Sequence, residues 1–256
     1  MPAAAMCPTY SAAAALTPPS SNTSVADGPF VLPPGAEYFV VLQRPAYGWP
    51  PARRITRFGR RFYERNVLRH VERRRRDEIA AQLRQGALDD FASLQPHLPE
   101  RCDSLLDVGC GLAGIDLLLH RHYGNPSVSL LDREGVSDTV YYGFKDEAAH
   151  YASLDHARRF LEANGVPADS VHTFDADRDG YPADGAFDLI ISIVSWGFHY
   201  PLDTYLADVE RTLAPGGTLI VDVRENTGAE EALGRLGPVT LVESSRVRRR
   251  LCVVRN

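Results

Sequence analysis

Short apolar runs alternate with amphipathic stretches from residue 104 to residue 224, and this alternation restricts the fold of the 256-residue chain more than any other feature. Apolar runs of about four to eight residues indicate buried strands, and apolar residues three and four apart indicate helices. Strands joined through helices pair in parallel. The pattern therefore predicts an α/β fold, with strands at 104–109, 127–132, 170–175, 187–195 and 218–224 and helices at 113–123, 151–165 and 201–217.

The first predicted strand runs into a glycine-rich turn, "LLDVGCGLAG", at residues 105–114. Gly109 and Gly111 allow turn conformations and a close approach of a ligand to the backbone. The helix that follows presents free N–H groups at its start. In a parallel sheet, ligands bind beyond the carboxyl ends of the strands. We therefore expect a binding site at this turn.

Asp132 ends the second predicted strand, 18 residues after Gly114. A carboxylate at this position can accept hydrogen bonds from both hydroxyls of a ribose. The glycine turn and this acid together predict a nucleoside ligand.

Two kinds of nucleoside cofactor fit, because the spacing of Gly109, Gly111 and Gly114 also matches the dinucleotide fingerprint. A dinucleotide places its pyrophosphate at the helix start. Asp107 lies two residues before the first glycine, where it disfavours a pyrophosphate and suits an ammonium group. This acid favours S-adenosylmethionine, while an NAD-dependent oxidoreductase or a non-catalytic nucleotide-binding protein is the alternative.

Four segments in order resemble the class I S-adenosylmethionine-dependent methyltransferases over residues 104–256: "LDVGCG", "LLD", "FDAD" and "FDLIIS" with "RTLAPGGTLIVDVR". Ala113 stands where many members have a further glycine. The resemblance implies a Rossmann-like, doubly wound, mostly parallel seven-stranded sheet that ends in an antiparallel hairpin at 237–256. It implies contacts of Asp175 with the adenine amino group and of Ala176 with the ring. The cofactor-binding residues it implies are Asp107, Gly109, Cys110, Gly111, Asp132, Arg133, Asp175, Ala176 and Ser192.

The substrate side of the site is expected in "SWGFHYP", residues 195–201, where family members place substrate-facing residues. His199 is the candidate base, because imidazole titrates near neutral pH; its alternative role is to cap the next helix or to pack in the loop. Trp196, Phe198 and Tyr200 are expected to form the pocket wall, with Tyr142 from a lid-like insertion at 132–159. "YYGF" and "SWGFHYP" faintly resemble bacterial sugar methyltransferases, so we expect O-methylation of a small molecule, with a sugar-like hydroxyl as one candidate.

The N-terminal hundred residues differ in composition from the rest of the chain. Residues 1–35 are rich in Ala, Pro, Ser and Thr and are expected to be a disordered tail. Residues 36–100 are expected to form a mainly helical extension, in which 37–51 adds a strand or a cap over the pocket. Residues 101–256 form the expected methyltransferase domain.

Eleven arginines between Arg53 and Arg76 form the one basic cluster. A solvated helix face explains it better than a nucleic-acid surface, which leaves RNA or protein methylation as an alternative function. The net charge of -5 gives no general attraction to nucleic acid or to an anionic membrane. The four cysteines show neither disulfide nor zinc spacing, and His120 and His122 have poor metal geometry. We expect a cytoplasmic protein without a metal, and homodimerisation is left open.

Overall fold

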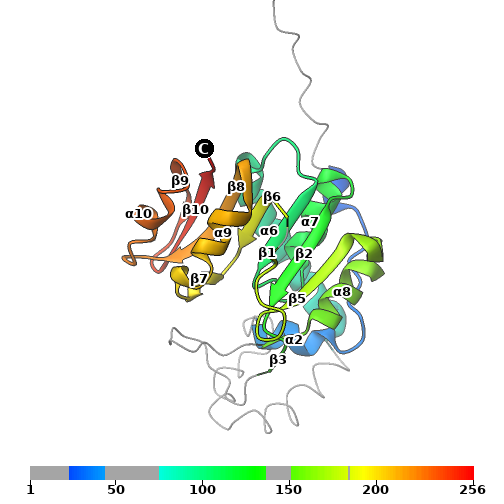
Figure 1. Ribbon diagram of the computed structural model, residues 1–256. Coiled ribbons are helices and arrows are strands. Elements are labelled where there is room, and N and C mark those ends of the chain that lie inside the picture. The colour runs from blue at the N-terminus through cyan, green and yellow to red at the C-terminus, as the bar shows by residue number, and fades with distance from the viewer. Residues whose placement is uncertain (1–22, 44–74, 137–150, 184) are drawn as a thin grey trace, which may run out of the picture.

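Seven strands form one sheet in the computed structural model, which describes residues 23–43, 75–136, 151–183 and 185–256 (Figure 1). Their order across the sheet is β5-β2-β1-β6-β8-β10-β9. The strands are β1 (Ser104–Val108), β2 (Ser127–Asp132), β5 (Val171–Asp175), β6 (Phe187–Ser192), β8 (Leu213–Arg224), β9 (Val239–Ser244) and β10 (Arg248–Val254).

The five strands from β5 to β8 are parallel, and β10 and β9 continue the sheet as an antiparallel pair. Strands β1, β2 and β6 are almost entirely buried, which fits apolar runs covered on both faces. The connecting helices are α7 (Gly114–Tyr123), α8 (Leu154–Ala163) and α9 (Leu206–Thr212). The predicted mostly parallel sheet with its closing hairpin is confirmed.

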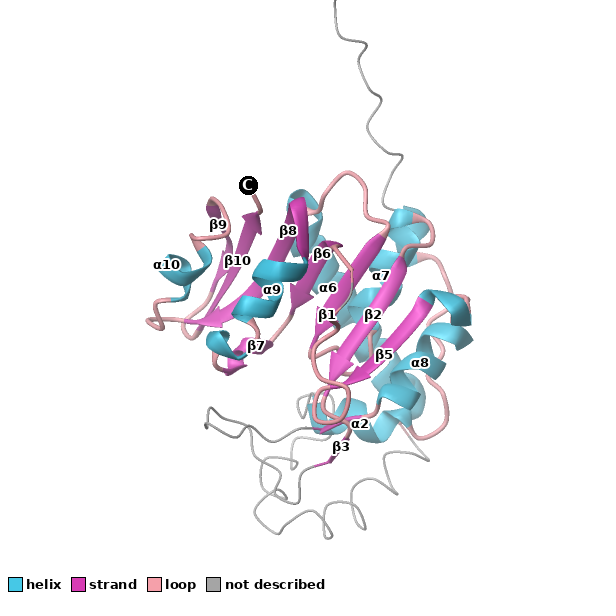
Figure 2. Ribbon diagram, viewed as in Figure 1, coloured by secondary structure: helices cyan, strands magenta, loops and turns pink. Residues whose placement is uncertain are grey.

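Helices cover both faces of the sheet (Figure 2). Side chains alternate between the faces along a strand. In β1, Leu105 joins a core cluster with residues of α7, α8 and the N-terminal helices, whereas Leu106 and Val108 join a second cluster with residues of α9 and α10 (Ala229–Leu233). The end of β1 therefore borders two separate packing layers.

The N-terminal part of the described chain packs on the first of these layers. It consists of α1 (Thr23–Ala26), α2 (Ala36–Gln43), α6 (Arg76–Leu94) and the 3-10 turn η3 (Gln95–His97). Val25 and Leu32 are buried, and Asn164 of the α8 end accepts from the Val31 N–H (2.7 Å) and donates to its carbonyl (3.0 Å). The expected disordered tail at 1–35 is therefore wrong for residues 25–35, because apolar contacts and hydrogen bonds fix them.

Several expected boundaries shift. Residues 36–43 form a helix, so the added strand expected within 37–51 is wrong for this part, while 44–51 lie outside the described residues.

The helix expected at 151–165 begins only at Leu154, because Ser153 accepts a hydrogen bond from the His156 N–H as an N-cap. Before it, β4 (Tyr151–Ala152) pairs with β3 (Gly135–Val136). Two further 3-10 turns are η4 (Ala168–Ser170) and η5 (Leu202–Thr204).

Two further differences lie near the expected site. The expected strand at 187–195 stops at Ser192, and a separate strand, β7 (Ser195–Tyr200), covers the segment expected to be a loop. The helix expected at 201–217 covers only 206–212 as α9, and its expected last residues belong to β8, which starts at Leu213 with a register irregularity opposite Phe187 and Leu189.

A buried guanidinium joins the N-terminal helix to the sheet. Arg250 of β10 is fully buried and donates through Nε and Nη2 to the two carboxylate oxygens of Asp222 in β8 (2.7 and 3.0 Å). It also donates to Asp90 (2.9 Å) and Ser93 of α6. The carboxylate of Asp222 is itself fully buried. Arg250 therefore neutralises and orients acids from two separate elements.

Replacing Arg250 with methionine is expected to destabilise the fold by about 3–5 kcal/mol, because the change leaves the buried Asp222 carboxylate without its main partner. The control is Arg249→Met in the adjacent position, which removes only the partly exposed ion pair with Glu230 and is expected to cost less than about 1 kcal/mol. Urea unfolding of both variants gives the two values. Equal losses would show that the buried network adds nothing beyond a surface pair.

Candidate functional site

The carboxyl ends of β1, β2, β5 and β6 lie at one edge of the sheet. From β1 the sheet extends through β2 to β5 on one side, whereas β6 lies on the other side of β1. The strand order therefore reverses between β1 and β6. A reversal of this kind opens a crevice outside the strand ends, where ligands bind in open α/β sheets.

The glycine turn that joins β1 to α7 lies at this edge. Gly109 has φ +85° and Gly111 has φ +56°, both in the left-handed region that glycine adopts without strain. The Gly109 N–H donates to the carbonyl of Leu131 (2.7 Å), and the Gly111 N–H donates to the Asp132 carboxylate (2.8 Å). The end of β2 therefore holds the turn in place.

Ala113 lies in the same turn, immediately before α7, with φ +59° and ψ +33°. A non-glycine residue pays a steric cost of about 1–2 kcal/mol in this conformation, because its Cβ crowds the following backbone. The backbone shape that a glycine would favour is therefore kept although the chain carries alanine here.

Asp132 is the acid at the centre of the site. One carboxylate oxygen accepts from the Gly111 N–H, and the other accepts from the Arg133 N–H (2.8 Å). Burial raises the pKa of Asp132 to about 6, and the hydrogen bonds from Gly111 and Arg133 oppose this rise. At neutral pH the group is therefore ionised. A carboxylate offers about four lone-pair positions, so two remain for a ligand.

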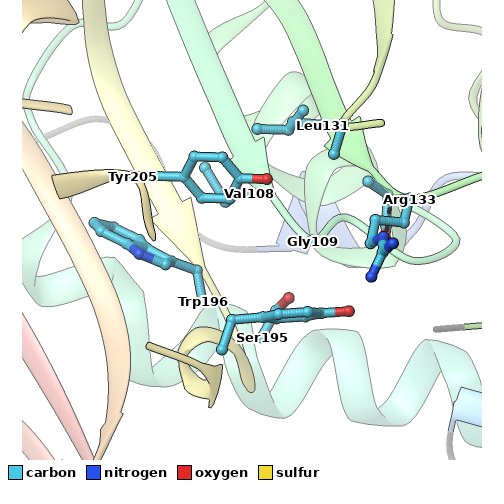
Figure 3. A pocket seen from close by; sticks show the side chains of 10 residues that line it. Val108, Gly109, Leu131, Arg133, Ser195, Trp196 and Tyr205 are labelled. Carbon is cyan, nitrogen blue, oxygen red and sulfur yellow. Dashed lines mark hydrogen bonds between the residues drawn. The ribbon is translucent and has the colours of Figure 1, made fainter. Parts of the chain in front are cut away.

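A small hollow opens between the ends of β1 and β2 and the strand β7 (Figure 3). Trp196 and Tyr205 lie on one side and Arg133 on the other. The hollow measures about 30 Å³, which is room for about two water molecules. The lining residues are Val108, Gly109, Leu131, Asp132, Arg133, Ala176, Ser195, Trp196, Tyr200 and Tyr205.

Two tyrosines line this hollow from different elements, Tyr200 at the end of β7 and Tyr205 before α9. Burial raises the pKa of Tyr200 to about 12, and the nearby Asp132 charge adds to the rise. The Tyr200 hydroxyl therefore remains protonated at neutral pH and can act as a donor. Arg133, opposite, forms an ion pair with Asp177 (3.0 Å) in the turn after β5.

Six of the sequence-predicted residues line the hollow: Gly109, Asp132, Arg133, Ala176, Trp196 and Tyr200. Asp107, Cys110 and Gly111 lie next to it in β1 and the glycine turn but do not line it. The side chain of Cys110 is buried. Tyr142 lies outside the described residues, as do half of the lid-like insertion and most of the arginine cluster.

Two other predicted residues use their side chains within the protein. The Ser192 hydroxyl donates to the Val108 carbonyl (2.7 Å) and accepts from the Trp196 N–H (2.9 Å), so it fixes the start of β7. Asp175 accepts from the N–H of Asp177 (3.1 Å) and stabilises the turn after β5. Both residues therefore shape the elements that surround the hollow.

His199 and Phe198 lie on β7 but do not line the hollow. Their rings meet edge to face, 5.0 Å apart. The Arg224 guanidinium lies 5.3 Å from the centre of the Phe198 ring, which draws Phe198 towards β8. His199 is partly exposed beside Tyr200. A base role for His199 remains a prediction.

Three residues of the site were not predicted. Tyr205 and Ser195 line the hollow, and Asp116 is a fully buried acid in the first turn of α7. Ser195 belongs to the segment proposed for substrate contact, so its position in the sequence pointed to it. The sequence pattern also distinguishes Asp116, because this acid interrupts an otherwise apolar helix face.

Other kinds of site find little support in the described residues. These residues hold no group of three or more His, Cys, Asp or Glu side chains placed to share a metal ion. Cys102, Cys110 and Cys252 are buried free thiols. Within the same residues, no helix combines the length and apolarity that crossing a membrane requires.

Solved structures resemble the chain more clearly than known sequences do. No protein-family model matches it, and no curated protein matches it. The geranyl diphosphate C-methyltransferase of Streptomyces coelicolor, solved with Mg²⁺, geranyl diphosphate and S-adenosyl-L-homocysteine, superposes with a TM-score of 0.51. The identity is 15%, over 70% of this chain and 83% of that one. This chain has a methyltransferase fold.

Two further methyltransferase structures superpose on this chain with lower TM-scores. A methyltransferase from Pyrococcus furiosus shares 17% identity at a TM-score of 0.47, over 66% of this chain and 82% of that one. The precorrin-6y C5,15-methyltransferase of Geobacter metallireducens shares 17% identity at 0.47, over 67% and 88%.

Replacing Gly109 with alanine is expected to destabilise the protein by about 2–4 kcal/mol, from a left-handed backbone and a steric clash. A Cβ at this position would lie 1.8 Å from Ser195 Oγ and 2.3 Å from Ser195 Cβ. The control is Gly124→Ala, which has φ +75° and no atom within 4 Å of the added Cβ, and is expected to cost about 1–2 kcal/mol.

Chemical denaturation of both variants measures the difference. Adding Ser195→Gly to Gly109→Ala should recover the steric part of the loss. An equal loss for Gly109→Ala and Gly124→Ala would mean that Ser195 does not cover the turn.

Proposed function

We propose that the chain is an S-adenosylmethionine-dependent methyltransferase that methylates a hydroxyl of a small molecule. The observation that carries this proposal is the joint geometry of the glycine turn and Asp132. The turn exposes backbone at the strand reversal, and the ionised Asp132 carboxylate lies at its side, bonded to the Gly111 N–H (2.8 Å). This arrangement suits a ribose beside a close-fitting backbone.

The residues present fit this cofactor. Asp132 keeps acceptor positions for the ribose hydroxyls, Ala176 lines the hollow where the ring of the base is expected, and Tyr200 and Tyr205 offer apolar ring surface. Beneath the turn, Asp107 has a buried carboxyl oxygen without a hydrogen-bond partner, which suits the ammonium group of the amino-acid end. When bound, the cofactor supplies a methyl group already activated on a sulfonium.

The hollow needs to widen before a nucleoside enters. Ligand pockets commonly measure about 300–1,000 Å³, whereas the volume of the hollow is about 30 Å³. Ser195, Tyr200 and Tyr205 are the side chains that narrow it, and rotation about their Cα–Cβ bonds changes its size. The rings of Tyr200 and Tyr205 then exclude water around the transferred methyl group, which favours in-line transfer.

A dinucleotide cofactor fits the same turn less well. A pyrophosphate would bring two negative charges to a helix start that already lies over the buried acids Asp107 and Asp116. Like charges in a poorly solvated place repel each other strongly. The acids therefore favour a ligand with a cationic end.

Asp132→Ala is expected to weaken binding of S-adenosylmethionine and S-adenosylhomocysteine by about 10- to 100-fold, because hydrogen bonds to a charged group contribute about 1.5–3 kcal/mol. Calorimetric titration of the purified protein with both ligands and with NADH measures this. The control is Asp169→Ala, an exposed acid in η4 whose removal should leave binding unchanged. Binding of NADH instead would overturn the proposal in favour of an oxidoreductase.

His199→Gln is expected to lower kcat by about 100-fold or more, since general-base catalysis typically contributes 10²- to 10⁴-fold. The rise in rate through neutral pH should vanish with it. The control is His172→Gln, because His172 is exposed on β5. Initial rates against pH with a hydroxyl substrate measure both. An unchanged pH profile in His199→Gln would exclude the base role.

A further inference from the structure

Two carboxyl groups lie buried together beneath the glycine turn. Asp107 in β1 is 3% exposed and Asp116 in α7 is fully buried. Both oxygens of Asp116 and Oδ1 of Asp107 have no hydrogen-bond partner. Buried polar atoms without partners are costly, so this pair requires a physical explanation.

The fold brings the two acids together. Side chains alternate along β1, so Asp107 points to the same face as Leu105, the face that α7 covers. Asp116 lies in the first turn of α7, directly after the glycine turn. The two carboxyl groups are within hydrogen-bonding reach of each other. Since a carboxylate only accepts, a hydrogen bond between them requires a proton on one.

The surrounding groups add negative rather than positive charge. Asp132 at the end of β2 and Asp90 in α6 both act on Asp107, and the neighbouring Cys110 thiol is buried and neutral. The nearby cation, Arg250, is already bound by Asp90 and Asp222. Within the described part of the chain, no ion pair reaches Asp107 or Asp116. Two ionised carboxylates here would repel each other without compensation.

We propose that Asp107 and Asp116 hold one proton between them in the free protein and release it to solvent when the ammonium group of the cofactor binds at the glycine turn. This inference rests on the proposed function for the identity of the cation. Asp116 thereby becomes a positioning residue that acts through Asp107. One positive charge replaces another, so the net charge of the buried pair and its occupant stays constant.

The titration behaviour of the pair agrees with this geometry. Burial, followed by the charge of Asp116, raises the pKa of Asp107 well above its usual range. Burial raises the pKa of Asp116 to about 7. The folded protein therefore binds a proton that the unfolded chain, with ordinary aspartates, has lost above about pH 4. Folding stability contributed by this proton falls as pH rises through the raised pKa.

The first test uses the protein without cofactor. Between pH 5 and pH 7, the unfolding equilibrium constant of the wild type should rise about tenfold more per pH unit than that of Asp107→Asn/Asp116→Asn, because the folded wild type holds one proton that the double variant lacks. Urea unfolding at several pH values measures both slopes. Asp132 titrates in the same range in both proteins, so the difference isolates the pair. Equal slopes overturn the shared proton, as does a difference of two protons, in which each acid holds its own; Asp107→Leu/Asp116→Leu repeats the test should the asparagine variant not fold.

The second test measures protons during binding. Titration calorimetry with S-adenosylmethionine at pH 6.5, in buffers of different ionisation enthalpy, should show close to one proton more released by the wild type than by Asp107→Asn/Asp116→Asn. Binding without proton release overturns the inference and leaves the proposed function intact. Absence of binding overturns the proposed function and the release with it, while the pH slopes still decide whether the pair shares a proton.

Discussion

The buried Arg250 guanidinium is the interaction on which the rest of the structure depends. It joins β10 to β8 through Asp222 and to α6 through Asp90, so the antiparallel end of the sheet and the N-terminal helices share one charged centre. The same Asp222 carboxylate accepts from the Val194 N–H (3.2 Å), in a turn with φ +56° at Val194. That turn leads directly to Ser195. The network around Arg250 therefore also fixes one wall of the hollow.

The fold was predictable where the burial of a segment determines its pattern of apolar residues. The apolar runs of β1, β2 and β6 are covered on both faces, and the glycines and Asp132 follow from local backbone geometry, so each carries its own signal. The first four residues of "SWGFHY" alternate between small and large side chains, as is typical of a strand. It was expected to be a loop because it directly follows another strand, and the break between the two depends on the Val194 turn.

The rest of the site depends on contacts between distant parts of the chain. Tyr205 lines the hollow only because η5 and α9 bring it back over the end of β1. Gln43 lies against the turn from α2, where its amide is within 2.8 Å of a Cβ built on Gly111, and it donates to the Tyr151 carbonyl (2.7 Å). No local pattern in the sequence encodes such contacts. The two faces of β1 also carry different features: the hollow lies on the Val108 side, and the paired acids lie on the other side.

The contact between Arg250 and Asp90 also determines how late in synthesis the chain can complete its fold. The two residues are 160 positions apart. At a synthesis rate of about 5–20 residues per second, Asp90 is added to the chain roughly 8–32 seconds before Arg250. During that interval α6 already carries the apolar side chains of Ile79, Phe91 and Leu94, which are buried in the finished fold. The apolar side chains of α6 therefore cannot complete their native packing for much of synthesis, and the contact between Arg250 and Asp90 forms only after β10 is made.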